Sequence, residues 1–276
     1  MKIQSPTALL IFPLLVVVFG LLVWPLCVLG YASVHSGQDL TLAHYVAIFT
    51  DPAYFTSLLH SLVMSLLVAA FATLVCLGPA WLMAHHSFPG KRLLRAALTL
   101  PMSLSGIMVG FLAIIMLGRV GVVPQLAAKW TAFPWLATWL SGSAYQLTGL
   151  VIAYLYFEIP RGVLSLETSL RKFDPQLSIA AASLGANAWQ RFRWVIFPLI
   201  RPALISTFAL TFSISLGSFG VALILSRRFS VLPLELFHQF TAMSNAPLAS
   251  AMALLLAAIA LAVQLLLRGT PWRSGR

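Results

Sequence analysis

Six stretches of this sequence are long and apolar enough to cross a lipid bilayer as helices. A transmembrane helix needs about 20 mostly apolar residues. Hydrophobic residues make up 60% of the chain and charged residues only 8%, whereas a soluble domain carries about 25% charged residues. We therefore predict an all-α, polytopic membrane protein with about six transmembrane helices. The predicted spans are roughly residues 8–32, 58–84, 98–118, 146–163, 198–225 and 247–267.

The predicted spans divide the chain into three parts. Residues 1–57 hold the first transmembrane helix and the first outer loop, residues 58–267 form a transmembrane domain, and residues 268–276 form a cytoplasmic tail. The first apolar run follows Lys2 and is longer than the apolar core of a signal peptide, which has about 7–15 residues. We expect this run to be retained as a membrane anchor.

The distribution of Lys and Arg predicts the orientation of the chain, because positive residues concentrate on the cytoplasmic side of a membrane. With both termini in the cytoplasm, only Arg119, Lys129, Arg227 and Arg228 of the 17 basic residues fall in outer loops. The net charge of +11 is then explained by the membrane topology, and the basic residues also attract the anionic headgroups of the lipid bilayer. No basic run is interleaved with aromatic residues in the manner of a stacking groove, so we expect no nucleic-acid partner.

A polar segment lies in the predicted inner loop between the fourth and fifth spans, at about residues 161–201. From Ile179 to Pro198 it reads IAAASLGANAWQRFRWVIFP. An apolar protein has little reason to keep such a segment unless a soluble partner docks there. The alternative is an amphipathic helix that contacts only the lipid surface.

Local signals predict two short helices in this loop. Asp174 and Pro175 make a favourable N-cap and first helical residue. Gly185 interrupts the first helix, because glycine adopts at no steric cost the positive φ that a turn between helices needs. Pro198 then starts the fifth span, since proline is tolerated in a first helical turn. The apolar residues that recur at helical spacing in the second helix are Trp189, Phe192, Val195 and Ile196.

The segment resembles the signature loop of bacterial ABC importer permeases, whose pattern is Glu-Ala-Ala, three residues, Gly, nine residues, Ile, one residue and Leu-Pro. The Leu-Gly-Ala run at 184–186 is intact, while Ile179 replaces the usual Glu and Phe197 replaces Leu. The resemblance extends over roughly residues 58–267. The positions that keep the spacing of the pattern are Ala180, Ala181, Gly185, Val195 and Pro198.

In the resembled family this loop is a coupling helix that inserts into a cleft on a cytoplasmic ATPase subunit. The resemblance also implies a second permease subunit, identical or homologous, a periplasmic solute-binding protein, and a place in the bacterial inner membrane. The residues that it implies for ATPase coupling are Ile179, Ala180, Ala181, Leu184, Gly185, Ala186, Trp189, Phe192, Val195 and Pro198.

Cofactor chemistry is expected in a partner and not in this chain. The sequence lacks the pattern G-x-x-x-x-G-K-[ST], whose loop cradles nucleotide phosphates, so ATP and Mg would be used by the partner ATPase. His85 and His86 are adjacent and point to different helix faces, unlike zinc ligands at i and i+4. We therefore expect no metal site and no catalytic residue.

The fifth span carries hydroxyl and small side chains inside an apolar segment. Such residues serve close helix packing, or they line water along a path. Gly106 and Gly110 in the third span indicate helix packing. Charges inside a membrane are costly, and Glu158 near Arg161 is either a structural ion pair or part of a gate. The residues predicted to face the translocation path are Ser213, Ser215, Gly217 and Ser218.

These patterns together predict the permease subunit of an ABC importer that moves a small polar solute from periplasm to cytoplasm by alternating access. A polyamine-type solute is the first expectation, with organophosphonate, ferric iron, thiamine and sulfate as alternatives. A self-contained secondary transporter or channel is less favoured, because internal inverted repeats and rows of buried ionisable groups are missing. An intramembrane enzyme is also less favoured, because His60 and Ser61 lack a third partner.

Overall fold

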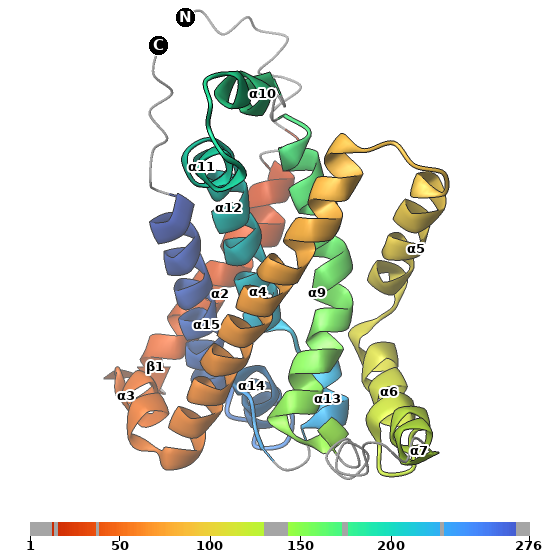
Figure 1. Cartoon of the computed structure of the whole chain (residues 1–276). Coiled ribbons are helices and arrows are strands. Elements are labelled where there is room, and N and C mark those ends of the chain that lie inside the picture. Colours follow the sequence, from red (N-terminus) through yellow and green to blue (C-terminus); the bar gives the residue numbers. More distant parts are fainter. Residues whose placement is uncertain are drawn as a thin grey trace, which may run out of the picture.

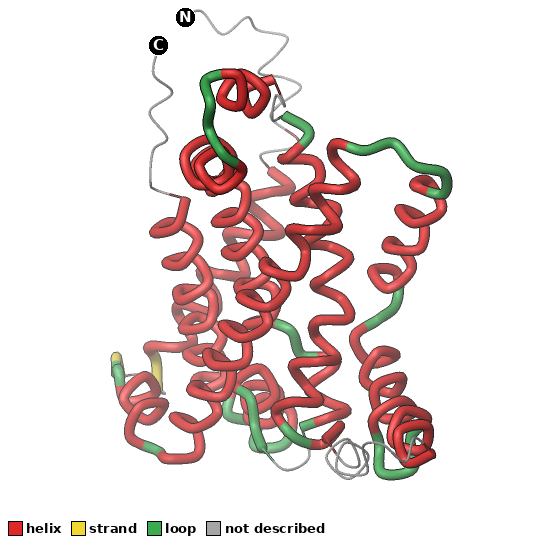
Figure 2. The backbone as a smooth tube through the Cα atoms, viewed as in Figure 1, coloured by secondary structure: helices red, strands yellow, loops and turns green. Residues whose placement is uncertain are grey.

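In the computed structural model, the chain is a bundle of helices joined by short loops (Figures 1 and 2). The structure describes residues 13, 16–36, 39–129, 143–172, 176–226 and 229–268. Several predicted features lie outside these ranges. They are Lys2, the helix start at Asp174 and Pro175, the outer-loop residues Arg227 and Arg228, and the tail beyond residue 268.

The described elements are helices, apart from a short antiparallel ladder in which His35 pairs with Leu40. In chain order they are η1 (Phe19–Val23), α2 (Trp24–Val34), β1 (His35–Ser36), β2 (Asp39–Leu40), α3 (Ala43–Thr50), α4 (Pro52–His85), α5 (Lys91–Ser103), α6 (Gly106–Leu117), α7 (Val122–Lys129), η2 (Ser143–Tyr145), α9 (Leu147–Leu170), α10 (Gln176–Ser183), α11 (Ala188–Arg191), η3 (Phe192–Ile196), α12 (Phe197–Gly217), α13 (Gly220–Leu225), α14 (Leu232–Thr241) and α15 (Ala246–Arg268).

Six segments of the described chain are long and apolar enough to span a membrane, which confirms the predicted all-α architecture with six spans. The described chain begins and ends at the same end of the bundle, which is also the end that carries α10 and α11 (Figure 1). The six segments are Val16–Val34, Pro52–His85, Gly106–Lys129, Leu147–Leu170, Ala188–Gly217 and Ala246–Leu267.

Helices α4, α9 and α12 form the centre of the bundle, since each packs against the other two. Helix α15 packs on α12 and α14, and α2 packs on α15. At the opposite edge, α5 contacts α9 and α6 contacts α13 (Figure 1). Buried apolar side chains form three clusters along this bundle. The cluster toward the α10 end includes Cys76, Met83, Leu166, Leu170 and Ile200.

The third predicted span, residues 98–118, is not one continuous helix as predicted. It divides into α5 and α6 because the backbone is extended at Leu104 and Ser105 between them. Pro101 lies in the last turn of α5, and Ser105 caps α6 by accepting a hydrogen bond from the amide of Met108 at 3.3 Å. A serine N-cap satisfies an amide that a new helix would otherwise leave unpaired.

The fifth predicted span, residues 198–225, is also shorter than predicted. Helix α12 ends at Gly217, and the backbone of Ser218 is extended. The hydroxyl of Tyr154 on α9 donates a hydrogen bond to the Ser218 carbonyl at 2.6 Å. This bond satisfies a carbonyl near the helix end, so α12 can stop inside the bundle and α13 can follow as a separate helix.

Glycines bring α6 and α13 into backbone contact. A Cβ atom added to Gly106 would lie 3.2 Å from the Cα of Gly220, and one added to Gly110 would lie 2.7 Å from the Cβ of Ile224. No larger side chain fits at Gly110 unless the two helices move apart. The packing role predicted for Gly106 and Gly110 is therefore confirmed.

We expect Gly110→Ala to destabilise the protein by about 1–3 kcal/mol, the usual cost of overpacking. Gly30→Ala is the matched control, because an added Cβ at that helical glycine meets nothing within 4 Å and alanine favours a helix over glycine by about 1 kcal/mol. Thermal unfolding of the purified protein in mild detergent measures the difference. Equal unfolding midpoints for the two variants would contradict the described contact.

Candidate functional site

The segment from α10 to the start of α12 projects from one end of the bundle (Figure 1). No residue of α10 is buried. Leu184, Trp189 and Trp194 are 90%, 69% and 73% exposed. Several large exposed apolar side chains on one short segment are typical of an interaction surface, so this segment is suited to docking a partner.

The turn between α10 and α11 is built around Gly185, whose φ is +85°. The Gly185 amide donates to the carbonyl of Ala182 at 3.0 Å, and the Ala186 amide donates to that of Ala181 at 3.1 Å. These two bonds make a Schellman cap, which places a left-handed residue, usually glycine, just after a helix. The predicted positive φ at Gly185 is confirmed.

A capping box starts α11. The amide of Gln190 donates to Oδ1 of Asn187 at 2.8 Å, and the amide of Asn187 donates to Oε1 of Gln190 at 2.9 Å. Two amides at the helix start are thus satisfied reciprocally. This box was not predicted, although the spacing Asn-x-x-Gln is a signal for it in the sequence.

Helix α11 continues into α12 through the π-helical turn η3, so one helical segment runs from Ala188 to Gly217. Pro198 lies in the first turn of α12 as predicted, but no break precedes it. A proline ring crowds the carbonyl four residues earlier. The wider π turn relieves this crowding, and the Phe197 amide bonds to the carbonyl of Phe192. The other π turn, η1, also ends two residues before a proline, Pro25.

The ten residues implied for ATPase coupling all lie in this projecting segment, with different exposure. The rings of Trp189 and Phe192 are 6.0 Å apart between centroids. The guanidinium of Arg193 lies 5.5 Å from the ring centroid of Trp194, which gives the aromatic surface a basic edge. Ala181, Ala186, Phe192 and Val195 are half-buried. The exposed members are Ile179, Ala180, Leu184, Gly185, Trp189 and Pro198.

The four residues predicted for the translocation path do not all lie at one open surface. Ser213 and Gly217 line a pocket of about 470 Å³ between α12, α14 and α15. Ser213 also accepts a hydrogen bond from Nε2 of Gln264 on α15 at 3.2 Å. In contrast, Ser215 is fully buried, and Ser218 is half-buried where α12 ends. A path along α12 stays a prediction, and Ser213 and Gly217 are its best-placed members.

Comparison with known proteins assigns the chain to a family. Residues 77–269 match the family described as "Binding-protein-dependent transport system inner membrane component". The chain belongs to this family. The predicted permease of a binding-protein-dependent transporter is therefore confirmed, as is its nature as a multi-pass membrane protein.

Two relatives of the chain are named as permease proteins of transport systems. The permease is 30% identical over 203 residues to the probable sulfate transport system permease protein cysT of Nephroselmis olivacea, a match that covers 71% of this chain and 66% of the relative. It is 32% identical over 176 residues to the molybdenum transport system permease protein ModB of Escherichia coli K12, covering 64% of this chain and 73% of the relative.

The fold of the permease is also found in a solved transporter. The crystal structure of a bacterial alginate ABC transporter, in complex with an alginate pentasaccharide-bound periplasmic protein, contains a similar chain. The TM-score is 0.77 at 17% identity, over 97% of this chain and 94% of that chain. At this identity the likeness shows the fold alone.

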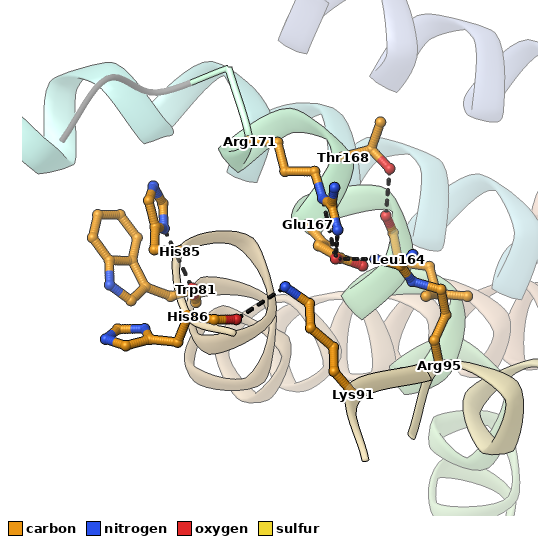
Figure 3. Close-up of polar contacts among 9 residues, drawn as sticks. All are labelled: Trp81, His85, His86, Lys91, Arg95, Leu164, Glu167, Thr168 and Arg171. Carbon is orange, nitrogen blue, oxygen red and sulfur yellow. Dashed lines mark hydrogen bonds and ion pairs between the residues drawn. The ribbon is translucent and has the colours of Figure 1, made fainter. Parts of the chain in front are cut away.

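Two buried carboxylates of the permease are ion-paired. Glu158 on α9 is 1% exposed and accepts a hydrogen bond from Nη1 of Arg161 at 2.6 Å, which agrees with the structural alternative in the sequence analysis. Glu167, 2% exposed, accepts bonds from Arg95 on α5 at 2.5 Å and from Arg171 at 2.8 Å (Figure 3). The Glu167 cluster was not predicted, because Arg95 is 72 positions from Glu167 in the sequence.

We expect Glu167→Gln to destabilise the permease by about 1–2 kcal/mol. Removing one partner of a buried ion pair is costly, but the two arginines are half exposed, so solvent screens part of the loss. Asp39→Asn is the matched control, since Asp39 is an exposed carboxylate of β2. Denaturation in mild detergent compares the two variants, and an unchanged midpoint in Glu167→Gln would show that the cluster contributes no stability.

Proposed function

We propose that the permease is the membrane-spanning subunit of an ABC importer that carries a small tetrahedral oxyanion, such as sulfate or molybdate, into the cytoplasm. The observation that carries the proposal is the similarity, over most of the transmembrane domain, to permeases named for sulfate and molybdenum transport. The oxyanion replaces the polyamine-type solute as our first expectation, while sulfate was already among the alternatives.

The buried charges of the spans support an anionic solute over a polycation. A polyamine would be favoured by unpaired carboxylates along the path, as are other cations in membrane pores. Within the described residues, the two carboxylates that are fully buried, Glu158 and Glu167, are both neutralised by arginine. Each of these two carboxylates therefore has an arginine that compensates its negative charge.

The projecting segment supports docking of a cytoplasmic ATPase. Its apolar and aromatic side chains are exposed, its turn is fixed by the Schellman cap at Gly185, and it continues directly into α12. Ile179 offers an apolar contact where the resembled family has a charged one. Movement of a docked ATPase would therefore be transmitted to the membrane helices by a rigid connection. ATP and Mg would be bound by that partner.

The distribution of basic residues supports a cytoplasmic location for the α10 end. The basic loop between α4 and α5 and the basic end of α9 lie at this end of the bundle (Figure 1), as expected for the cytoplasmic side of an inner membrane. A second permease subunit would complete the path, and a periplasmic binding protein would deliver the solute at the opposite end. Alternating access would follow from closure and opening of the ATPase pair.

Uptake of radiolabelled solutes tests the proposal in cells that produce the permease. Deletion of its gene should abolish the binding-protein-dependent uptake of sulfate or molybdate and leave putrescine uptake unchanged, and a plasmid copy should restore it. Loss of putrescine uptake alone would overturn the oxyanion assignment. Unchanged uptake of every solute under ATP depletion would overturn the importer assignment.

We expect Gly185→Asp to abolish transport and ATPase association while leaving membrane insertion intact. A side chain at φ +85° strains the turn, and the carboxylate adds a negative charge to the docking surface. Gly185→Asn is the matched variant, because asparagine has the same shape and the same tolerance of the left-handed region as aspartate but no charge, so a larger loss in the Asp variant measures the effect of the charge. Co-purification of a P-loop ATPase, identified by mass spectrometry, is the readout. Association of the Asp variant at the wild-type level would contradict the docking assignment.

A further inference from the structure

A basic pocket lies beside the Glu167 cluster, at the end of the bundle that carries α10. It has a volume of about 440 Å³ and lies between the loop after α4, the start of α5 and the end of α9. Four of the residues that line it are basic, namely Lys91, Arg92, Arg95 and Arg171. Figure 3 shows three of them, with Arg95 and Arg171 reaching Glu167 from different helices.

The pocket has more positive charge than its own contacts neutralise. Glu167 is the carboxylate that pairs with Arg95 and Arg171, and Lys91 donates its hydrogen bond to the neutral carbonyl of His86 at 3.0 Å. Among the residues that the structure describes at the pocket, four cations and one carboxylate leave an excess of about three positive charges by simple charge counting. The side chains of Arg95 and Arg171 are still 44% and 48% exposed, so a further acceptor can reach them.

The backbone at the start of α5 adds to this attraction. Gly90, with φ +86°, precedes the helix, and no side chain caps its first turn. The first amides of a helix carry partial positive charge and favour anions. The four basic side chains and this helix start therefore converge on the same pocket, and their chemistry is that of a site for a phosphate group.

The surface next to the pocket is apolar. Helix α5 has no buried residue, and Leu93 and Leu100 on it are 75% and 67% exposed. Helix α5 lies at the edge of the bundle and makes its main contact with α9 (Figure 1). The pocket itself lies where α4 and α9 end, which is the expected level of lipid headgroups. A ligand that binds both the basic pocket and the apolar surface of α5 needs an anionic headgroup and an apolar tail.

We propose that this pocket binds the headgroup phosphate of an anionic phospholipid, whose acyl chains lie along the exposed leucines of α5. Basic pockets between transmembrane helices on the cytoplasmic side are suited to such headgroups. The lipid would add negative charge to that of Glu167, and its acyl chains would cover the exposed leucines of α5. The proposal is independent of the solute that the permease carries.

Native mass spectrometry of the full permease in mild detergent tests the proposal. Dioleoyl phosphatidylglycerol should bind in preference to dioleoyl phosphatidylcholine, which has the same acyl chains and no net charge. Arg92→Gln should weaken phosphatidylglycerol binding about fivefold, the effect of one basic residue near an anionic membrane, and Arg92→Lys should retain it. Lys129→Gln is the matched control, because it removes one exposed positive charge from α7 at the opposite end of the bundle (Figure 1).

Several results would overturn the proposal. Equal binding of the two lipids would show that charge does not select the ligand, and an equal loss in Lys129→Gln would show that binding is not localised at the pocket. Displacement of phosphatidylglycerol by inorganic phosphate or sulfate at equal concentration would show that the pocket holds a small free oxyanion and not a lipid. Size-exclusion profiles of all the variants confirm that each remains folded.

Discussion

Helix α9 determines much of the arrangement of this permease, because its buried polar side chains need partners from other elements of the bundle. Such groups cost several kcal/mol when they lack a partner. The Tyr154 hydroxyl bonds to the carbonyl of Ser218, and the Glu167 carboxylate bonds to Arg95. These two contacts fix the end of α12 and the start of α5 against the same helix. The polar residues of α9 therefore position elements at both ends of the bundle.

The sequence predicted those features that depend on neighbouring residues. The six spans follow from local hydropathy, and the turn at Gly185 follows from the one residue type that adopts its φ without strain. Contacts between distant residues were not predictable. Arg95 and Glu167 are 72 positions apart, so the ion cluster was missed. Tyr154 and Ser218 are 64 positions apart, so the end of α12 was placed too late.

The residues predicted for the translocation path also depend on contacts that the sequence does not show. Ser213, Ser215 and Gly217 are close in sequence, but their surroundings depend on which side of α12 faces α4 and α9 and which faces α15. Packing buries Ser215 and leaves Ser213 and Gly217 at the pocket with α14. The residue types predicted a series of polar and small side chains in α12. Which of them are buried and which line the pocket depends on the helices that pack around α12.

The π turn η3 has a consequence for how the permease can change over evolution. A π turn holds one residue more than an α turn, and one residue corresponds to about 100° of rotation around a helix. Deleting a residue from Phe192–Ile196 would therefore turn the face that carries Trp189 by that angle relative to α12. The length of the helical segment from Ala188 to Gly217 would hardly change. Insertion or deletion of a residue at this single turn can thus change the direction of the projecting helix face without changing that of the membrane-spanning face.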